Sequence, residues 1–340
     1  MRILVTGAGS LIGHGILRSM RQISDKDFFI ITADPDHRAA GHWLGDHGVI
    51  IPLAKAPDYI DALKNIIITH KIDLVFIGTD PELLKISNAL DQLPTTVVVS
   101  SPGVIAIGDD KWQTVQFLKS NGFPFPDSAL SDDIDLVKAL VARVGFPLIA
   151  KPRIGARSAG LKIILSEQDL SGVPRQGYVI QELLPEGPGE FTAGTMTYHG
   201  RCYSQVIFRR DLKDGNTYRA YTYSNPSHAE FLRTVSEKMQ GVYGPLNFQY
   251  RLKNDRPVVF EVNSRFSGTT PLRTAVGVNE VAMAIDFAQN GRVDPVQQKL
   301  QNVAILRTWS DIIVPIDQLD LFSDAGEIDA PRATYFPFMT

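Results

Sequence analysis

The chain has 340 residues, of which 44% are hydrophobic and 21% are charged, and its formal net charge is −3. This length indicates two or three domains, and the small negative charge argues against electrostatic attraction to nucleic acid or to an anionic membrane. The one cysteine, Cys202, excludes an internal disulfide and a cysteine-cluster zinc site. We expect a cytoplasmic protein with no nucleic-acid or membrane partner, because no apolar run approaches the ~20 residues of a membrane span and no signal peptide precedes the first strand.

The first hundred residues alternate short apolar runs with amphipathic segments. Residues 2–6 lead into a glycine-rich turn that starts at Gly7, and apolar residues then recur at helical spacing. Further strands are predicted at 28–32, 73–78 and 95–100, and a helix is predicted at 59–70. Strands that alternate with helices predict a parallel α/β sheet, and we assign residues 1–108 to a Rossmann-like N-terminal domain.

A second unit begins near Asp109. This residue and Asp110 can cap a helix over 111–121. Further helices are predicted at 136–144, 228–240 and 280–289, and strands at 178–184, 191–198 and 201–208, the last two joined by a two-residue hairpin turn. The tail carries strand-like pieces but no motif, and we treat 291–340 as a C-terminal extension.

Two alternating runs, at 246–252 and 258–265, are predicted to form a hairpin. If its turn is centred near Asp255, Gln249 lies opposite Glu261 and Asn247 lies opposite Asn263. One apolar face is then expected to hold Leu246, Phe248, Tyr250 and Leu252 from the first strand and Val258, Phe260 and Val262 from the second.

Gln249, Glu261 and Asn263 would gather oxygen donors on the opposite face of this hairpin. Hard divalent cations take oxygen ligands, and Mg²⁺ usually binds through one or two carboxylates plus substrate phosphates. A magnesium–nucleotide site is one interpretation, and a solvated polar face is the other. The choice depends on the register, because a slip of one residue would turn these side chains to the other face.

A basic, glycine-containing loop follows an apolar strand that ends at Lys151. Small residues let the backbone approach an anion, and cations neutralise phosphate charge. The loop carries Arg153, Gly155, Arg157, Gly160 and Lys162. It suits a triphosphate, although a basic surface turn would have the same composition. The chain has no Walker A sequence, so it is not a P-loop protein.

Residues 109–290 resemble the ATP-grasp ligases, most closely the carbamoyl phosphate synthetase-like branch. The resemblance rests on the order of five segments, which are Asp110-Lys111, residues 146–152, residues 179–184 with Gly189-Glu190-Phe191, residues 244–249 and residues 260–265. It implies an α/β structure (the α+β ATP-grasp fold), in which the N-terminal domain precedes a two-lobed ATP-grasp domain at 109–290. A lid subdomain is expected at about 123–178.

The resemblance also implies the roles of individual residues. Lys111 and Lys151 match the positions that hold the nucleotide phosphates, and the loop at 153–160, with Arg157 and Gly160, matches the lid over the triphosphate. The other implied positions are Glu182, Leu183 and Leu184 at the adenine, Glu190 at the ribose, Gln249, Glu261 and Asn263 at the metal, and Arg265 as a catalytic residue, with Lys151, near the transferred phosphate.

The reaction implied is an ATP- and Mg²⁺-dependent joining of a small-molecule carboxylate to an amine through an acyl phosphate. Mn²⁺ is an alternative metal, and a homodimer is an expected assembly. The chemistry needs no nucleophilic side chain, because the protein positions the reactants and neutralises the spreading charge. Residues 208–213, with Arg219 and Arg273, could bind substrate carboxylates or form a basic solvated face.

Two other functions remain open from the sequence. Residues 5–13 look like the start of a short-chain dehydrogenase or epimerase, and Asp34 sits where such an enzyme contacts the NAD ribose. A lone glycine turn can also simply pack a strand on a helix, and the Tyr-x3-Lys pair usual in those enzymes is absent. A non-catalytic nucleotide-binding protein is the second alternative, against which the complete set of metal-ligand positions argues.

Overall fold

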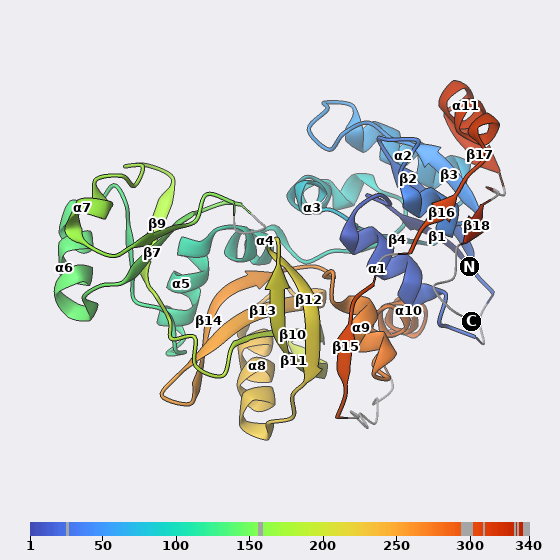
Figure 1. Ribbon diagram of the computed structural model, residues 1–340. Helices are drawn as coiled ribbons and strands as arrows, with labels where there is room; N and C mark the ends of the chain where they lie inside the picture. The colour runs from blue at the N-terminus through green and yellow to red at the C-terminus, as the bar shows by residue number, and fades with distance from the viewer. Residues whose placement is uncertain are drawn as a thin grey trace.

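The computed structural model describes residues 1–24, 27–155, 159–293, 302–308, 310–329, 331 and 333–335. Their strands form one six-stranded sheet near the N-terminus, a second six-stranded sheet, a four-stranded sheet and a two-stranded ribbon. Figure 1 shows the four-stranded sheet in a lobe at the left, the second sheet in the middle and the N-terminal sheet at the upper right. None of the described helices is long and apolar enough to cross a membrane.

The N-terminal sheet has the order β17-β3-β2-β1-β4-β5. Its parallel strands are β1 (Arg2–Val5), β2 (Phe29–Asp34), β3 (His47–Ile50), β4 (Leu74–Phe76) and β5 (Thr96–Val98). The helices of this region are α1 (Leu11–Met20), α2 (Tyr59–Thr69), α3 (Asp80–Ser87) and α4 (Pro102–Asp109), with the short 3-10 turns η1 (Ala40–Leu44) and η2 (Leu90–Gln92). The predicted parallel sheet is confirmed, whereas β3, α3 and α4 were not expected.

The central sheet is antiparallel, with the order β14-β13-β10-β11-β12-β15. Its strands are β10 (Glu190–Tyr198), β11 (Arg201–Lys213), β12 (Asn216–Thr222), β13 (Tyr243–Lys253), β14 (Arg256–Asn263) and β15 (Ala304–Leu306). The predicted hairpin is confirmed, since Tyr198 pairs with Arg201 across the turn. The helices beside this sheet are α5 (Lys111–Ser120), α8 (Pro226–Lys238), α9 (Thr270–Ala275) and α10 (Glu280–Asn290).

Buried apolar side chains join the central sheet to its neighbours on both faces. Leu118 of α5 and Leu232 of α8 pack against Phe248 in one cluster. Met196 of β10 belongs to another cluster, which includes Phe76 of the N-terminal sheet. The central and N-terminal sheets therefore share a hydrophobic core, and burial of this apolar surface fixes their relative position.

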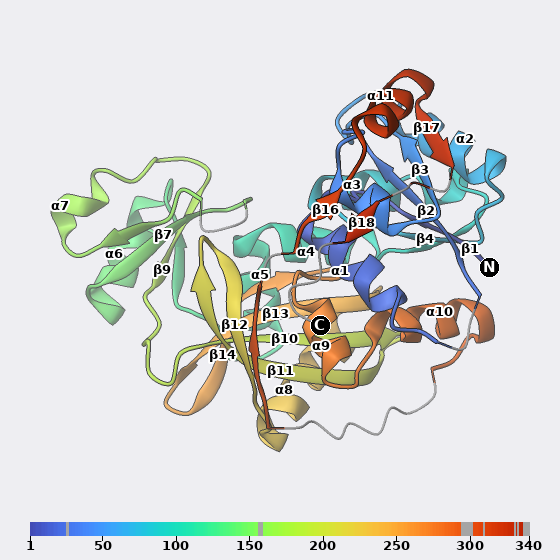
Figure 2. The ribbon, with the colours of Figure 1, turned by 45° about the vertical axis from the view of Figure 1, so that its right-hand side comes forward.

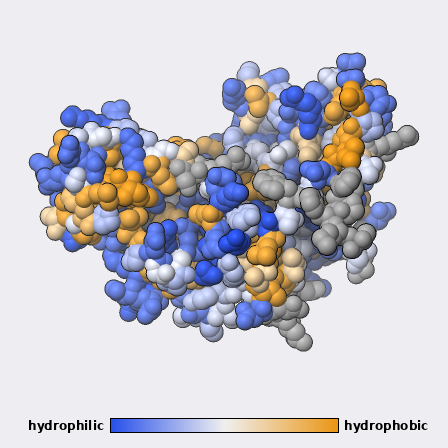
Figure 3. Space-filling model, in the orientation of Figure 1, coloured by the Kyte–Doolittle hydropathy of each residue, from blue (hydrophilic) through white to orange (hydrophobic). Residues whose placement is uncertain are grey.

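The four-stranded sheet forms a lobe with its own core. It comprises β6 (Ser128–Leu130), β7 (Leu148–Pro152), β8 (Lys162–Ile164) and β9 (Tyr178–Glu182), covered by α6 (Ile134–Val144) and α7 (Glu167–Leu170). Leu140, Leu148 and Ile180 are buried there. Apolar side chains also gather on the outer surface of this lobe (Figure 3), and Ile163 and Leu165 are among the exposed ones. Lys151 lies near the end of β7 and pairs with Val179, while Glu182, at the end of the antiparallel β9, pairs with Leu148.

Residues beyond 290 return to both large sheets. β15 pairs with β12, and β17 (Glu327–Asp329) pairs antiparallel with β3 at the edge of the N-terminal sheet. Phe322 of α11 (Ile316–Ala325) packs on Trp43 and Ile328, and Figure 2 shows α11 and β17 beside the N-terminal strands. A short ribbon of β16 (Ile312–Ile313) and β18 (Thr334–Tyr335) completes this region. The domain limits at residues 108 and 290, and the lid limits at about 123–178, stay predictions.

The hairpin of β13 and β14 has the predicted register at its polar end. Asn247 pairs with Asn263, and Gln249 pairs with Glu261. The register shifts beyond Gln249, because Tyr250 pairs with Val259 and leaves Phe260 as the extra residue of a β-bulge.

The bulge also changes which side chains of β14 reach the core. Val259 and Val262 are buried in the central core, while Phe260 lines a cavity beside Glu261. The prediction that Phe260 shares a face with Val258 and Val262 was therefore wrong, since strict alternation does not hold across a bulge.

Candidate functional site

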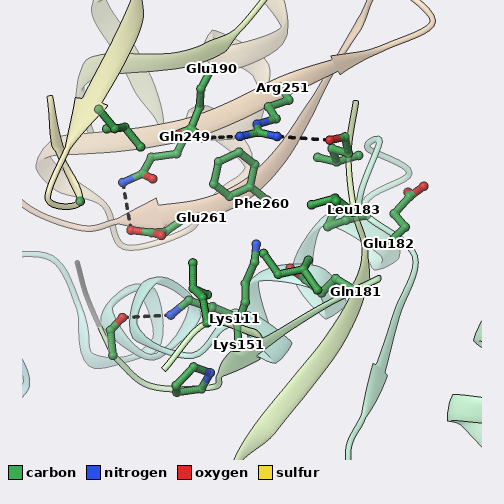
Figure 4. A pocket seen from close by; sticks show the side chains of 18 of the residues that line it. Lys111, Lys151, Gln181, Glu182, Leu183, Glu190, Gln249, Arg251, Phe260 and Glu261 are labelled. Atoms are coloured by element: carbon green, nitrogen blue, oxygen red, sulfur yellow. Dashed lines mark hydrogen bonds and ion pairs between the residues drawn. The ribbon is translucent and has the colours of Figure 1, made fainter. Parts of the chain in front are cut away.

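A cavity of about 220 Å³ lies between the four-stranded lobe and the central sheet (Figure 4). It brings together most of the residues that the sequence singled out, namely Lys111, Lys151, Glu182, Leu183, Leu184, Glu190, Gln249 and Glu261. Gly160 does not line it, although its neighbours Ala159 and Leu161 do. Asn263 and Arg265 extend the group beyond the cavity through hydrogen bonds. Arg157 lies outside the described residues.

Two buried lysines form the basic side of this cavity. The ammonium group of Lys151 lies 4.7 Å from the centre of the Phe260 ring, and burial lowers its pKa to about 8, an effect that the nearby Glu261 carboxylate opposes. Lys111 donates a hydrogen bond of 2.9 Å from Nζ to the carbonyl oxygen of Gly155. Two buried cations near each other favour an anion between them, because a bound anion would offset the cost of their desolvation.

Asp110 fixes the position of Lys111. Its carboxylate caps α5 by accepting a hydrogen bond from the backbone N–H of Trp112 at 2.9 Å. It also forms an ion pair of 2.5 Å with Arg153, which follows β7. Asp110 thereby holds the start of α5, which carries Lys111, against the end of β7, which carries Lys151.

A connected series of side chains forms the acidic side. Glu190 accepts hydrogen bonds from Arg210, at 2.5 and 3.1 Å, and from Arg251 at 3.3 Å. Arg210 also donates to Gln249 Oε1 at 2.8 Å, and Gln249 Nε2 donates to Glu261 Oε1 at 3.0 Å. Neighbouring strands β10, β11, β13 and β14 supply these side chains, so the order of the sheet produces the series.

The series continues from Glu261 to the N-terminal sheet. Asn263 Nδ2 donates to Glu261 Oε1 at 3.1 Å, and Asn263 Oδ1 accepts a hydrogen bond of 3.0 Å from Arg265. Arg265 in turn donates from Nε to Asp80 Oδ1 at 2.7 Å. Asp80 begins α3, so the contact joins the end of the central sheet to the N-terminal region. We call the full set, Glu190, Arg210, Gln249, Glu261, Asn263, Arg265 and Asp80, the polar relay.

The donor set of the polar relay suits a hard cation. The amide groups of Gln249 and Asn263 both lie within hydrogen-bonding distance of the Glu261 carboxylate. Mg²⁺ takes oxygen ligands of these types. The amide oxygens of Gln249 and Asn263 accept hydrogen bonds from Arg210 and Arg265, so binding a cation requires these amides to turn their oxygens toward it.

Glu182 lies at the opposite end of the cavity from the polar relay. Lys253 contacts its Oε2 at 2.5 Å, and the backbone N–H of Asp127 donates to its Oε1 at 3.0 Å. Arg251 donates to the carbonyl oxygen of Leu184 at 3.3 Å. These contacts fix the chain at 182–184, and Glu182, Leu183 and Leu184 all line the cavity there.

A second cavity, of about 550 Å³, adjoins the first between the central and N-terminal sheets. Arg210, Gln249 and Glu261 line both cavities, and Arg265 and Arg307 line the second. Arg307, which follows β15, was not singled out from the sequence. The one available signal was its place next to a short alternating strand, which is too weak to indicate a site.

The structure separates the arginines that were expected to bind a substrate carboxylate. Arg273 is 1% exposed and forms an ion pair of 2.7 Å with the fully buried Glu280. Arg210 binds Glu190, and the half-exposed Arg219 lies 3.9 Å from Asp211 on β11. The three therefore do not form one binding surface, because the pattern of basic residues in the sequence does not show which of them are already paired.

The glycine turn after β1 has a packing role. Gly9 donates its backbone N–H to Asp34 at 2.8 Å, so this carboxylate closes the turn. Ser10 caps α1 by accepting from Gly13 and donates to the carbonyl oxygen of Gly78 at 2.6 Å. A side chain at Gly41 would meet the carbonyl oxygen of Ala8, so η1 lies directly against the turn. These contacts support a packing role, and Gly7, Ser10 and Asp34 also line the second cavity described above.

Known proteins resemble this chain in sequence. Residues 175–309 match the model of a family described as ATP-grasp in the biosynthetic pathway with Ter operon. The carbamoyl phosphate synthase large chain of Mycobacterium sp. (strain JLS) is 27% identical over 210 residues, which cover 55% of this chain and 18% of that protein. The chain thus spans less than a fifth of the length of this relative.

Solved structures share the fold. N5-carboxyaminoimidazole synthetase from Staphylococcus aureus, complexed with ADP, superimposes with a TM-score of 0.67 at 16% identity, over 95% of this chain and 86% of that chain. For the L-amino acid ligase from Bacillus licheniformis the TM-score is 0.65 at 15% identity, over 94% and 84%. These structures confirm the predicted α/β ATP-grasp fold. The family match over residues 175–309, the sequence relatives and the shared fold together support an ATP-grasp ligase.

Proposed function

We propose that this protein is an ATP- and Mg²⁺-dependent carboxylate–amine ligase that acts through an acyl phosphate. The observation that carries the proposal is the first cavity, where the buried Lys111 and Lys151 line the same space as the Glu261 carboxylate and the Gln249 amide. A carboxylate is a poor acyl donor, and phosphate transfer from ATP converts it into a group that an amine can attack. Such a reaction requires a site that holds a triphosphate and a carboxylate together.

The nucleotide would lie along the first cavity. Lys111 and Lys151 bind its phosphates, and the loop that contains Arg157 and Gly160 covers them. Glu182 and the backbone of Leu183 and Leu184 contact adenine, while Glu190 accepts a hydrogen bond from the ribose. Arg210 and Arg251 already contact the Glu190 carboxylate, which supports this role, because they hold the acceptor in place.

Gln249, Glu261 and Asn263 would hold Mg²⁺, or Mn²⁺ in its place. The metal supplies positive charge that neutralises the phosphates. Arg265 serves as a catalytic residue beside the transferred phosphate, and Lys151 shares this role. Asp80 orients the Arg265 guanidinium through the 2.7 Å contact. Lys151 and Arg265 would thus stabilise the negative charge that develops on the transferred phosphate.

The second cavity would accept the carboxylate and the amine. It opens directly on Gln249 and Glu261, and two of the arginines that line it, Arg265 and Arg307, can neutralise a small acid. The resemblance to an L-amino acid ligase supports an amino acid as one of the two reactants. A cytoplasmic homodimer completes the proposal, and light scattering on the purified protein tests the dimer.

The test is ADP release from Mg-ATP with a matrix of amino acids, small acids and amines, with hydroxylamine added to trap an acyl phosphate as a hydroxamate. We expect a few acids to release ADP and to give hydroxamate, and one pair to give an amide. Calorimetric titration with Mg-ATP and with NADH supplies the control. Tight binding of NADH without binding of Mg-ATP would contradict the proposal.

A further inference from the structure

Four metal-ligating side chains gather at the edge of the N-terminal sheet. His47 lies on β3, His70 directly follows α2, and Glu327 and Asp329 lie on β17, which pairs with β3. None of them lines either cavity. The ATP-dependent chemistry proposed above therefore gives this cluster no role.

The distances within the cluster are close to those of a tetrahedral zinc site. His47 Nε2 lies 3.4 Å from Glu327 Oε2, and His70 Nε2 lies 3.7 Å from the same oxygen. One ligand atom from each of the three residues lies within 4.8 Å of the others. With metal–ligand bonds of about 2.0–2.1 Å, neighbouring ligand atoms of a tetrahedral site lie about 3.4 Å apart. Small side-chain rotations would therefore admit an ion.

The state of His47 is a second and independent observation. Its ring is buried, and its Nε2 has no hydrogen-bond partner among the described residues. Asp329 Oδ1 lies 2.7 Å from the other ring nitrogen, Nδ1. A carboxylate at Nδ1 holds the proton there and leaves the lone pair of Nε2 free, as in carboxylate–histidine–zinc arrangements. A buried, unsatisfied nitrogen is costly unless a ligand fills the position.

His70 lies beside His47, with the two ring centres 4.7 Å apart. Imidazole binds metals only when the ligating nitrogen is deprotonated. Two imidazoles with one carboxylate suit Zn²⁺ far better than Mg²⁺, which prefers oxygen ligands alone.

We propose that His47, His70 and Glu327 bind one Zn²⁺ ion, with Asp329 orienting His47 and water as the fourth ligand. The ion joins β17 to β3 and to the end of α2. It therefore fastens the C-terminal segment, which includes α11, to the edge of the N-terminal sheet. The site is separate from the nucleotide cavity, because none of these residues lines it.

The experiment uses the untagged full-length chain, stripped with a chelator and titrated with Zn²⁺ or Co²⁺. We expect one ion per chain by calorimetry, visible absorption bands of tetrahedral Co²⁺, and a Tm increase of roughly 5 °C at a hundredfold excess over Kd. Hydrogen exchange at the backbone of 327–329 should slow in the same titration.

His70→Asn and Glu327→Gln should abolish these effects. His37→Asn is the matched control, because His37 also lies near a carboxylate, at 3.9 Å from Asp36, but belongs to no cluster of three such ligands among the described residues.

Two results would overturn the proposal. One is that the wild type binds no zinc. The other is zinc binding of unchanged strength in both His70→Asn and Glu327→Gln, and its loss in Glu261→Gln would then assign the ion to the nucleotide cavity. Glu327 is a half-exposed side chain, so its substitution tests the site without removing a buried group.

Discussion

The chemistry of single residues in the first cavity depends on burial as much as on residue type. Lys151 is 9% exposed and has a pKa lowered to about 8, mainly by desolvation. Between pH 8 and 10.5 the unfolded chain binds this proton while the folded chain has lost it. The free energy of unfolding should therefore rise with pH over this range. At pH 7, the buried charge destabilises the protein without nucleotide.

Lys151→Met tests this assignment through opposite effects on stability and binding. Removal of the charge should raise the Tm without nucleotide at pH 7, and the gain over wild type should shrink toward pH 10. Affinity for Mg-ATP should fall roughly 10- to 150-fold, since a charge-assisted hydrogen bond contributes about 1.5–3 kcal/mol. Thermal scans and calorimetry across pH 7–10 measure both. Unchanged ATP affinity in the folded variant would show that Lys151 does not face a phosphate.

Glu261 supplies the only carboxylate among the three proposed metal ligands. Glu261→Gln keeps the shape but removes the charge, so ATP turnover should fall at least ~100-fold while Tm without nucleotide stays within a few degrees. Stabilisation by Mg-ATP should shrink as well. Glu186→Gln is the control, because Glu186 is an exposed carboxylate on the loop before Glu190. Retained Mg²⁺-dependent turnover would refute the proposed metal site.

At the scale of elements, the sequence predicted the parallel sheet, both hairpins and the polar end of the β13–β14 register. These features could be predicted because alternation and turn residues are visible within a few positions of the sequence. The bulge at Phe260 could not, because no nearby residue marks it. The turn occupies Asn254 and Asp255, at φ +52° and +59°, and alone it would set a register one step away from the one predicted. The bulge restores the pairing of Gln249 with Glu261, so this prediction was right for an incomplete reason.

Other features of the site depend on pairings between distant segments. The sequence does not show that Glu280 neutralises Arg273. It also does not show that Arg307, which follows β15, lines the second cavity. Both follow from the way helices and strands pack. The ordered motifs that identify an ATP-grasp fold were readable because each lies within a few residues. Contacts such as Arg265 to Asp80, 185 positions apart, were not.

Strand β10 has to pass directly over the buried Arg273–Glu280 pair. A methyl group at Gly194 would lie 2.3 Å from Arg273 Nε and 2.4 Å from Glu280 Oε1. Gly194→Ala should therefore destabilise the fold by about 2–4 kcal/mol, through overpacking and displacement of a buried ion pair. Chemical denaturation measures this. Gly103→Ala, where nothing lies within 4 Å in helix α4, should be neutral or slightly stabilising. Equal stability of the two variants would contradict the argument.

At the scale of the whole molecule, the polar relay connects the nucleotide cavity to the N-terminal sheet. Its last contact, from Arg265 to Asp80, joins the end of β14 to the start of α3. Nearby, burial raises the pKa of Asp109 to about 6, and the charge of Asp80 adds to this effect. The N-terminal region therefore places charge next to the proposed phosphoryl-transfer site.

Asp80→Asn tests whether the Arg265–Asp80 contact affects catalysis without affecting the binding of nucleotide. Without the carboxylate, Arg265 loses its orienting partner, while Lys111, Lys151 and Glu190 keep their contacts. We expect kcat to fall about tenfold, since a loss of roughly 1.5 kcal/mol in transition-state stabilisation corresponds to that factor, while the Kd for Mg-ATP changes less than about twofold. The pKa of Asp109 should also fall toward its ordinary value, because a nearby negative charge has gone. In the wild type the raised pKa of Asp109 makes the free energy of unfolding fall as pH rises from about 4 to 6, and this fall should be smaller in Asp80→Asn. Asp91→Asn, at an exposed position in η2, should change none of these quantities. A parallel loss of ATP affinity and kcat in Asp80→Asn would mean that Asp80 supports the nucleotide cavity as a whole rather than Arg265 alone.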